Sequence, residues 1–130
     1  MPVSVIASGD CEILLLQAKR IMLGDGNGCG LHGTLVFNLL KVMATKNLVL
    51  NRKIEITAKQ STREKLLAYL LLQAKQAGCN SFTIPYDRQE LADYLGVERS
   101  GLSAVIGRLQ KEGVLCSRKN AFTLLTYPIK

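Results

Sequence analysis

The sequence predicts a mainly α-helical protein with a small β component, in which a long helix precedes a helix-turn-helix domain. An apolar repeat with coiled-coil spacing runs through residues 31–58, and two capping-box patterns open shorter amphipathic helices further on. A chain of 130 residues is long enough for one modest domain together with one long helix. Its hydrophobic content of 48%, with no Trp, favours a helical core built mainly from Leu and Ile.

Residues 1–30 contain two short apolar runs that favour β-strands. The runs are residues 3–7 and 11–16, and Ser8-Gly9-Asp10 between them is a turn signal. Two strands do not form a stable sheet alone, so we expect a β remnant that belongs to a fragment, or to a natural short form whose strands pair elsewhere. Residues 24–33 hold five glycines and are interpreted as a flexible connector. A phosphate-binding loop is the alternative, but the Lys-Ser/Thr ending of such a loop is missing.

Residues 31–58 are predicted to form one long helix that pairs with a second copy. The positions expected to face the partner helix, called the seam below, follow one another at alternating steps of four and three residues: Val36, Leu40, Met43, Asn47, Leu50 and Ile54. Asn47 stands where an apolar residue is expected, and in a parallel pair it would meet its symmetry mate and set the register. The alternative is an ordinary amphipathic helix packed within one chain.

Residues 59–130 are predicted to form a helical domain with a hairpin. Ser61 and Glu64 form a capping-box pattern, and Gly78 ends the helix that they open. A short strand over residues 82–84 stops at Pro85. After Gly113, residues 114–117 and 122–126 are interpreted as a hairpin whose turn lies near residues 118–120.

Residues 87–109 are interpreted as two short helices joined at Gly96. Asp87 and Glu90 form the opening capping box, and Gly96 allows the sharp turn. The inward positions recur at helical spacing: Leu91, Ala92, Leu95, Val97, Leu102, Val105, Ile106 and Leu109. Such a motif places its second helix in the DNA major groove.

The outward positions of this motif predict contacts with double-stranded DNA. We expect Arg99, Ser100 and Ser103 to read base edges. The candidates for phosphate contacts are Arg88, Arg108, Arg118 and Lys119. A net charge of +7 favours a polyanionic partner, although a solvated basic surface is the alternative for such a cluster.

These features resemble the carboxy-terminal part of the Crp-Fnr family of bacterial transcription regulators, the catabolite activator class. Residues 87–109 are similar to its DNA-binding motif, and residues 35–56, with Asn38-Leu39-Leu40, to its dimerisation helix. Residues 61–70, 82–85 and 111–115 look like the next helix, the strand before the motif and the run into the wing. The resemblance implies a remnant of the effector β-roll plus connector over 1–30, a dimerisation helix over 31–58 and a winged helix-turn-helix over 59–130.

The resemblance also implies a cytoplasmic transcription regulator without a cofactor, acting as a homodimer on a palindromic site, with most of the sensor domain missing. RNA polymerase is a further candidate partner. The sequence departs from the family at Ala104, where members commonly carry an arginine after the serine that Ser103 matches. Altered specificity is therefore expected. The alternative function is a protein interaction module, or an inactive dimerising short form that does not read DNA.

Other classes of function find little support. Cys11, Cys29, Cys79 and Cys116 are scattered without a Cys-x-x-Cys pair, so we expect reduced, buried thiols and no metal. His32, the one histidine, opens the long helix, and no nucleophile–base pair indicates an enzyme. No signal peptide and no apolar run of membrane-spanning length are present, which favours a cytoplasmic protein.

Overall fold

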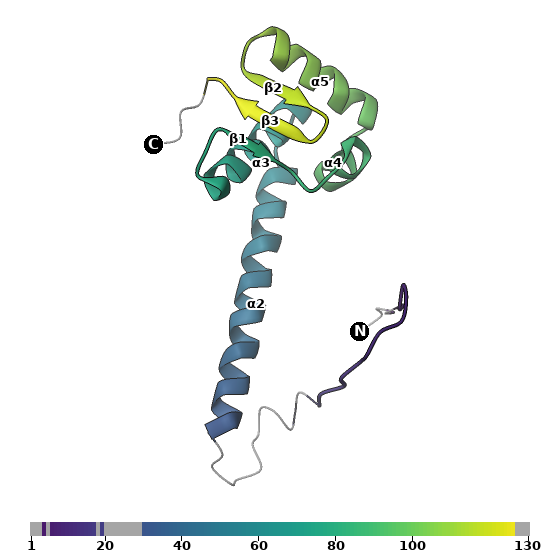
Figure 1. Ribbon diagram of the computed structural model, residues 1–130, viewed down its shortest axis with the longest axis vertical. Helices are drawn as coiled ribbons and strands as arrows, with labels where there is room; N and C mark the ends of the chain where they lie inside the picture. The colour runs from purple at the N-terminus through teal and green to yellow at the C-terminus, as the bar shows by residue number, and fades with distance from the viewer. Residues whose placement is uncertain (1–3, 5, 18, 20–29, 127–130) are drawn as a thin grey trace. The chain divides into compact units, whose positions relative to one another are not determined.

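The computed structural model describes residues 4, 6–17, 19 and 30–126. Its elements, in chain order, are α2 (Gly30–Thr57), α3 (Thr62–Ala77), β1 (Ser81–Thr83), α4 (Arg88–Leu95), α5 (Arg99–Lys111), β2 (Leu115–Arg118) and β3 (Ala121–Leu124) (Figure 1). The predicted fold class, mainly helical with a small β component, is confirmed. The chain divides into two compact units, Met1–Asn47 and Leu48–Lys130, which are described separately.

The amino-terminal residues that the structure describes do not form the predicted strands. Residues 8–10 are a bend, as expected, but residues 11–16 have no strand hydrogen bonding, so that prediction is wrong. The physical reason is that a strand requires a neighbour, and none is present among residues 4 and 6–17. Ile13, Leu14 and Leu15 accordingly remain exposed. The first run, 3–7, lies partly outside the described residues, and the connector, 24–33, lies largely outside them.

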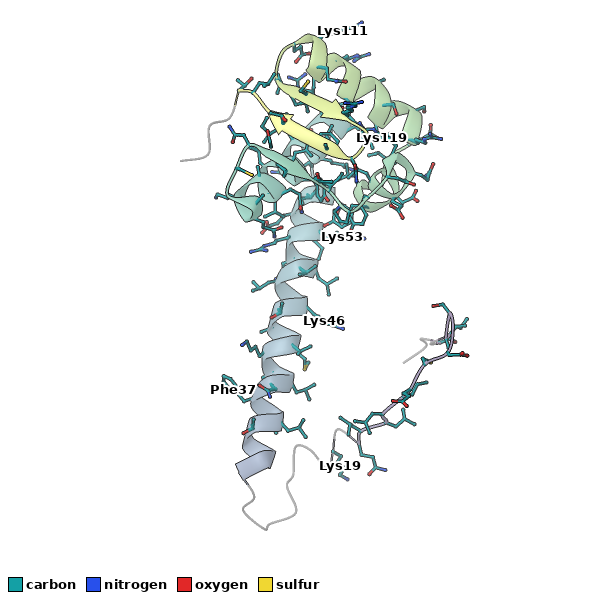
Figure 2. All side chains as sticks on the ribbon, in the orientation of Figure 1. Lys19, Phe37, Lys46, Lys53, Lys111 and Lys119 are labelled. Atoms are coloured by element: carbon teal, nitrogen blue, oxygen red, sulfur yellow. The ribbon has the colours of Figure 1, made fainter. Side chains whose placement is uncertain are left out.

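Helix α2 agrees with the predicted helix to within one residue at each end. The hydroxyls of Thr45 and Thr57 donate to the carbonyls of Lys41 and Lys53, each at 2.8 Å. The predicted seam is open to solvent in the single chain, where Leu40, Met43, Leu50 and Ile54 are between 58% and 62% exposed. Side chains project from α2 all along its length (Figure 2). Near its end, Ile56 joins the buried core.

Helix α3 begins and ends at the predicted residues. The Glu64 amide donates to the Ser61 hydroxyl at 3.2 Å, and the Ser61 amide donates to the Glu64 carboxylate at 3.3 Å. Gly78 follows in the left-handed conformation, with φ 68°. The buried face of α3 includes Tyr69, which the apolar spacing did not single out.

Helices α4 and α5 form the predicted helix-turn-helix. The Asp87 capping box is complete, with both of its hydrogen bonds to Glu90 at 2.8 Å. Gly96 lies at φ 64° and ψ 47°, and the Val97 amide donates to the Ala92 carbonyl at 3.0 Å, which closes the turn. The inward positions of both helices are buried as predicted: Leu91, Ala92, Leu95, Leu102, Ile106 and Leu109. Val97 and Val105 are half-buried against them.

The three strands form one antiparallel sheet in the order β1-β3-β2. Phe82 pairs with Phe122 between β1 and β3, and Cys116 pairs with Thr123 between β2 and β3. The predicted hairpin is correct, with its strands displaced by about one residue. Its turn is Lys119-Asn120, and Lys119 adopts a positive φ of 54°.

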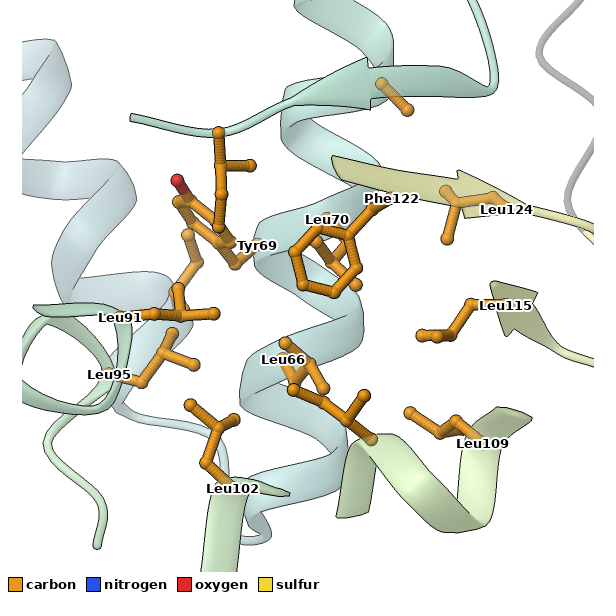
Figure 3. Close-up of a cluster of buried hydrophobic side chains, with 14 of the residues drawn as sticks. Leu66, Tyr69, Leu70, Leu91, Leu95, Leu102, Leu109, Leu115, Phe122 and Leu124 are labelled. Carbon is orange, nitrogen blue, oxygen red and sulfur yellow. The ribbon is translucent and has the colours of Figure 1, made fainter. Parts of the chain in front are cut away.

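One hydrophobic cluster holds α3, α4, α5 and the sheet together. Figure 3 shows its largest side chains, which include Leu66, Leu70, Leu109, Leu115 and Phe122. No buried polar or charged residue occurs within the described ranges.

The prediction that the cysteines are buried is wrong. Cys11, Cys79 and Cys116 are exposed free thiols, and Cys29 lies outside the described residues. Cys116 is exposed because it points to the solvent side of β2, while its neighbour Leu115 points into the core.

The two glycines of the helix-turn-helix should respond oppositely to alanine. Gly96→Ala is expected to lower the free energy of unfolding by about 1–2 kcal/mol, because a side chain in the left-handed region is strained. Gly101→Ala is expected to raise it by up to about 1 kcal/mol, since Gly101 is helical and a methyl group there would meet open space. Urea denaturation measures both changes. Equal shifts of the same sign would contradict the turn geometry.

Candidate nucleic-acid interface

Helix α5 presents two chemically different faces. Leu102, Ile106 and Leu109 are buried in the core. Burial of this face turns the opposite face of the helix to solvent. The exposed side chains include Arg99, Ser100, Ser103, Ala104 and Arg108. All three predicted base-reading residues therefore lie on the exposed side of α5. Two further long side chains, Gln110 and Lys111, are exposed in the last turn of α5.

A groove of about 680 Å³ lies beside the start of α5. Its walls come from three segments: residues 85–90 around the start of α4, Arg99 at the start of α5, and Lys119 and Asn120 at the hairpin turn. Lys119 is at the tip of the β2–β3 hairpin (Figure 2). The fold therefore brings Arg88, Arg99 and Lys119 to one surface, although they are separated in sequence.

The groove carries a net positive charge. It has three cationic side chains and two carboxylates, those of Asp87 and Glu90. Both carboxylates already accept backbone N–H bonds in the α4 capping box. These bonds leave both carboxylates charged, so the three cations exceed the carboxylates by one charge, and this net positive charge suits an anion.

The hairpin tip is held in place against the segment that leads into α4. The Ile84 amide donates to the Asn120 carbonyl at 3.0 Å, and the Asn120 side-chain amide donates to the Ile84 carbonyl at 3.2 Å. These two bonds set the position of neighbouring Lys119 relative to the start of α4. Asn120 was not identified from the sequence, where its only signal was its position at a predicted turn.

Arg88 is partly engaged within the domain. Its guanidinium donates to the Ser117 hydroxyl at 3.1 Å and lies 5.0 Å from the centroid of the Phe122 ring. Burial lowers the pKa of Arg88, but a guanidinium stays protonated at neutral pH. A guanidinium has five N–H donors, so Arg88 connects α4 to the hairpin and still has donors for a phosphate.

The other two predicted phosphate ligands lie outside the groove. Arg108, in the last turn of α5, and Arg118, at the end of β2, are both exposed and are not part of its walls. Sequence reasoning missed Pro85, Tyr86 and Gln89, which complete the walls. Their position before and within the first turn of α4 was the only signal available.

The architecture of this domain and its sequence can both be compared with those of known proteins. A helix-turn-helix that exposes a cationic groove beside its second helix is the architecture of a DNA-binding domain. Residues 64–127 match the Crp-like helix-turn-helix domain family. The matched region starts within α3 and includes every element that lines the groove. No curated protein matches the chain. Residues 64–127 are therefore similar to a Crp-like helix-turn-helix, a domain type of DNA-binding transcription regulators.

The described residues hold neither a helix suited to a membrane nor a cluster suited to a metal. None of their helices combines the length and apolar character needed to span a bilayer. They also contain no group of three or more His, Cys, Asp or Glu side chains arranged to hold a metal ion.

Arg88→Gln should destabilise the domain before any DNA is added. It removes a hydrogen bond and a cation–π contact, so the expected loss is about 1–2 kcal/mol of unfolding free energy. Arg118→Gln is the matched control, because that exposed side chain should change stability by less than about 0.5 kcal/mol. Chemical denaturation compares the two. Equal stability of both variants would show that Arg88 does not connect α4 to the hairpin.

Proposed function

We propose that this protein is a transcription regulator that inserts α5 into the major groove of double-stranded DNA. The observation that carries the proposal is the cationic groove formed by Arg88, Arg99 and Lys119 beside the exposed start of α5. In this arrangement Arg99, Ser100 and Ser103 meet base edges, and Arg88, Arg108, Arg118 and Lys119 meet phosphates. The β2–β3 hairpin then acts as a wing that brings Lys119 to the DNA backbone.

Arg99 is proposed to carry most of the base discrimination. A guanidinium can make two hydrogen bonds to guanine, which contributes about 1–3 kcal/mol of selectivity. Ser100 and Ser103 have short side chains, and Ala104 has no hydrogen-bonding group. Within the first two turns of α5, Arg99 is the one long polar side chain, which predicts weaker sequence selectivity than several such residues would give.

Helix α2 is proposed to join two copies of the chain. The seam (Val36, Leu40, Met43, Asn47, Leu50, Ile54) is exposed except at the half-buried Val36. It has the spacing of a two-stranded coiled coil, and Asn47 occupies an a position. A dimer presents two copies of α5 to major grooves about 34 Å apart, which predicts a palindromic site. On this view residues 59–130 bind DNA and residues 31–58 dimerise, while residues 1–30 remain as the end of a sensor domain.

A second candidate function is an interaction module that dimerises without reading DNA. Two observations favour it: Ala104 where the family's arginine is expected, and the exposed apolar seam of α2. The salt dependence of binding distinguishes the two candidate functions. DNA binding weakens steeply as the salt concentration rises, because Lys and Arg side chains that contact phosphates displace counterions from the DNA. Docking through apolar side chains does not weaken in this way.

Binding to DNA selected from a random pool tests the main proposal. Arg99→Ala should weaken binding to the selected site by about 1–3 kcal/mol and binding to unrelated DNA by much less. Lys119→Ala should weaken both alike and reduce the slope of log K against log salt by about 0.9. Lysine and alanine are equally disfavoured at the positive φ of residue 119, so the backbone strain is the same in both proteins. The difference in DNA affinity therefore reports the loss of the Lys119 charge. Salt-independent binding, or no selected sequence, would favour the interaction module.

Sedimentation of two α2 variants tests the dimer. Leu40→Glu places a charge in the proposed seam and should convert the dimer to a monomer. Lys41→Glu also adds an acid, but outside the seam, so it should leave the dimer intact. A monomeric wild-type chain, or equal behaviour of the two variants, would refute pairing through this seam.

A further inference from the structure

A second cavity, of about 230 Å³, lies on the same compact unit, Leu48–Lys130, as the cationic groove. Its walls come from four places: the last turns of α2, one face of α3, the end of α4 and the segment Pro85–Tyr86. Three of the chain's four tyrosines, Tyr69, Tyr86 and Tyr94, are among its lining residues. The proposed contacts to DNA use none of these three side chains.

Tyr69 provides the first sign that this cavity takes a ligand. Its side chain is almost fully buried, with 2% of the residue exposed, and its hydroxyl has no hydrogen-bond partner within the described part of the chain. Figure 3 shows the hydroxyl at the end of the ring that points away from Leu70 and Phe122. Burial, followed by the neighbouring Tyr86 and Tyr94, raises the pKa of Tyr69, so it stays a neutral O–H donor. A buried hydroxyl without a partner is costly, and an acceptor atom on a ligand would remove that cost.

The tyrosine rings make an aromatic wall. Tyr86 and Tyr94 are stacked, with centroids 5.3 Å apart and planes at 28°. Tyr69 lies 5.2 Å from Tyr94 at a tilt of 55°. The Lys53 ammonium lies 5.0 Å from the Tyr94 centroid. Such a wall favours a flat ring, which packs on or against aromatic faces at these separations.

The polar part of the lining has cationic and amide character. Arg52 contributes a guanidinium from α2, and Gln73 and Gln76 contribute amides from α3. Arg52 has no ion pair among the residues that the structure describes. A guanidinium pairs with a carboxylate through two parallel hydrogen bonds. Within the described ranges, no acidic side chain lines this cavity.

We propose that this cavity binds a small aromatic carboxylate. The ring of the ligand packs against Tyr86 and Tyr94, its carboxylate meets Arg52, and an acceptor oxygen takes the hydrogen bond of the Tyr69 hydroxyl. The volume is adequate, since a cavity of about 150 Å³ is enough for benzene. The other lining residues, Val49, Leu72 and Pro85, supply apolar contact for the ring.

The position of the cavity connects it with DNA binding, a part of the inference that rests on the proposed function. Pro85 and Tyr86 line both this cavity and the cationic groove. They directly precede Asp87, the capping residue of α4. A ligand that moves Tyr86 therefore changes the wall that Arg88 and Lys119 share, and we expect its binding to change DNA affinity.

Benzoate binding to the full chain, without DNA, tests the site itself. We expect NMR shifts of tyrosine ring signals and a Kd of about 1 mM or tighter by calorimetry. Benzyl alcohol, which lacks the carboxylate, and cyclohexanecarboxylate, which lacks the aromatic ring, should each bind at least tenfold more weakly, by about one unit of log Kd. Absence of tyrosine shifts, or equal binding of the three probes, would overturn the proposal.

Two variants assign the contacts. Tyr69→Phe and Arg52→Gln should each weaken benzoate binding by about tenfold to a hundredfold. Tyr69→Phe removes a hydroxyl that has no partner within the described residues, so it should not lower the melting temperature, and lost binding cannot then be attributed to unfolding. Arg118→Gln is a control for loss of one positive charge and should bind benzoate normally. Unchanged affinity in both cavity variants would overturn the site.

A DNA titration at saturating benzoate tests the connection between the two sites. At the lowest benzoate concentration that saturates the wild type, its DNA affinity should change at least threefold, and that of Tyr69→Phe should change less. Benzoate binding without any change in DNA affinity would overturn the connection and support the site alone. If the chain binds no DNA, the proposed function fails, and the benzoate measurements on the free chain still decide the cavity.

Discussion

The burial of one face of α5 is the constraint on which the functional surface depends. Leu102, Ile106 and Leu109 enter a core shared with α3, α4 and the sheet, and their helical spacing leaves no freedom in the rotation of α5 about its axis. Arg99 and the serines are exposed as a consequence. Each large buried side chain in such a core typically contributes a few kcal/mol to stability, so the orientation of α5 is held far more strongly than any surface contact holds it.

The cationic groove is assembled by polar contacts between segments distant in sequence. The capping box of α4 occupies the two carboxylates, the paired bonds between Asn120 and Ile84 hold the hairpin tip, and Arg88 joins α4 to the hairpin. None of these contacts is strong alone, since a typical hydrogen bond contributes about 1 kcal/mol. Together they place three cations on one surface that two carboxylates share, and the net positive charge suits a DNA backbone.

Two features of the structure carry energetic costs in the single chain. The α2 seam leaves large apolar side chains in water, and the Tyr69 hydroxyl is buried without a partner among the described residues. Partners that remove these costs are therefore physically favoured: a second helix for α2, and an acceptor atom for Tyr69. Pro85 and Tyr86 lie in the walls of both cavities, so the proposed ligand of Tyr69 would bind next to the cationic groove.

The sequence by itself determined the helices and their ends, because capping boxes and left-handed glycines are local features. Asp87 with Glu90, Ser61 with Glu64, and Gly96 all act within a few residues of one another. It also determined which side of α5 is exposed, through helical periodicity. It failed where the outcome depends on distant partners: residues 11–16 have no neighbouring strand within the described ranges, and the free cysteines lie on the surface. Only the tertiary structure decided that Arg88 bonds to Ser117, that Arg88, Arg99 and Lys119 share a groove, and that three tyrosines surround a cavity. Those contacts join positions far apart in the chain, and no local pattern encodes which of them meet.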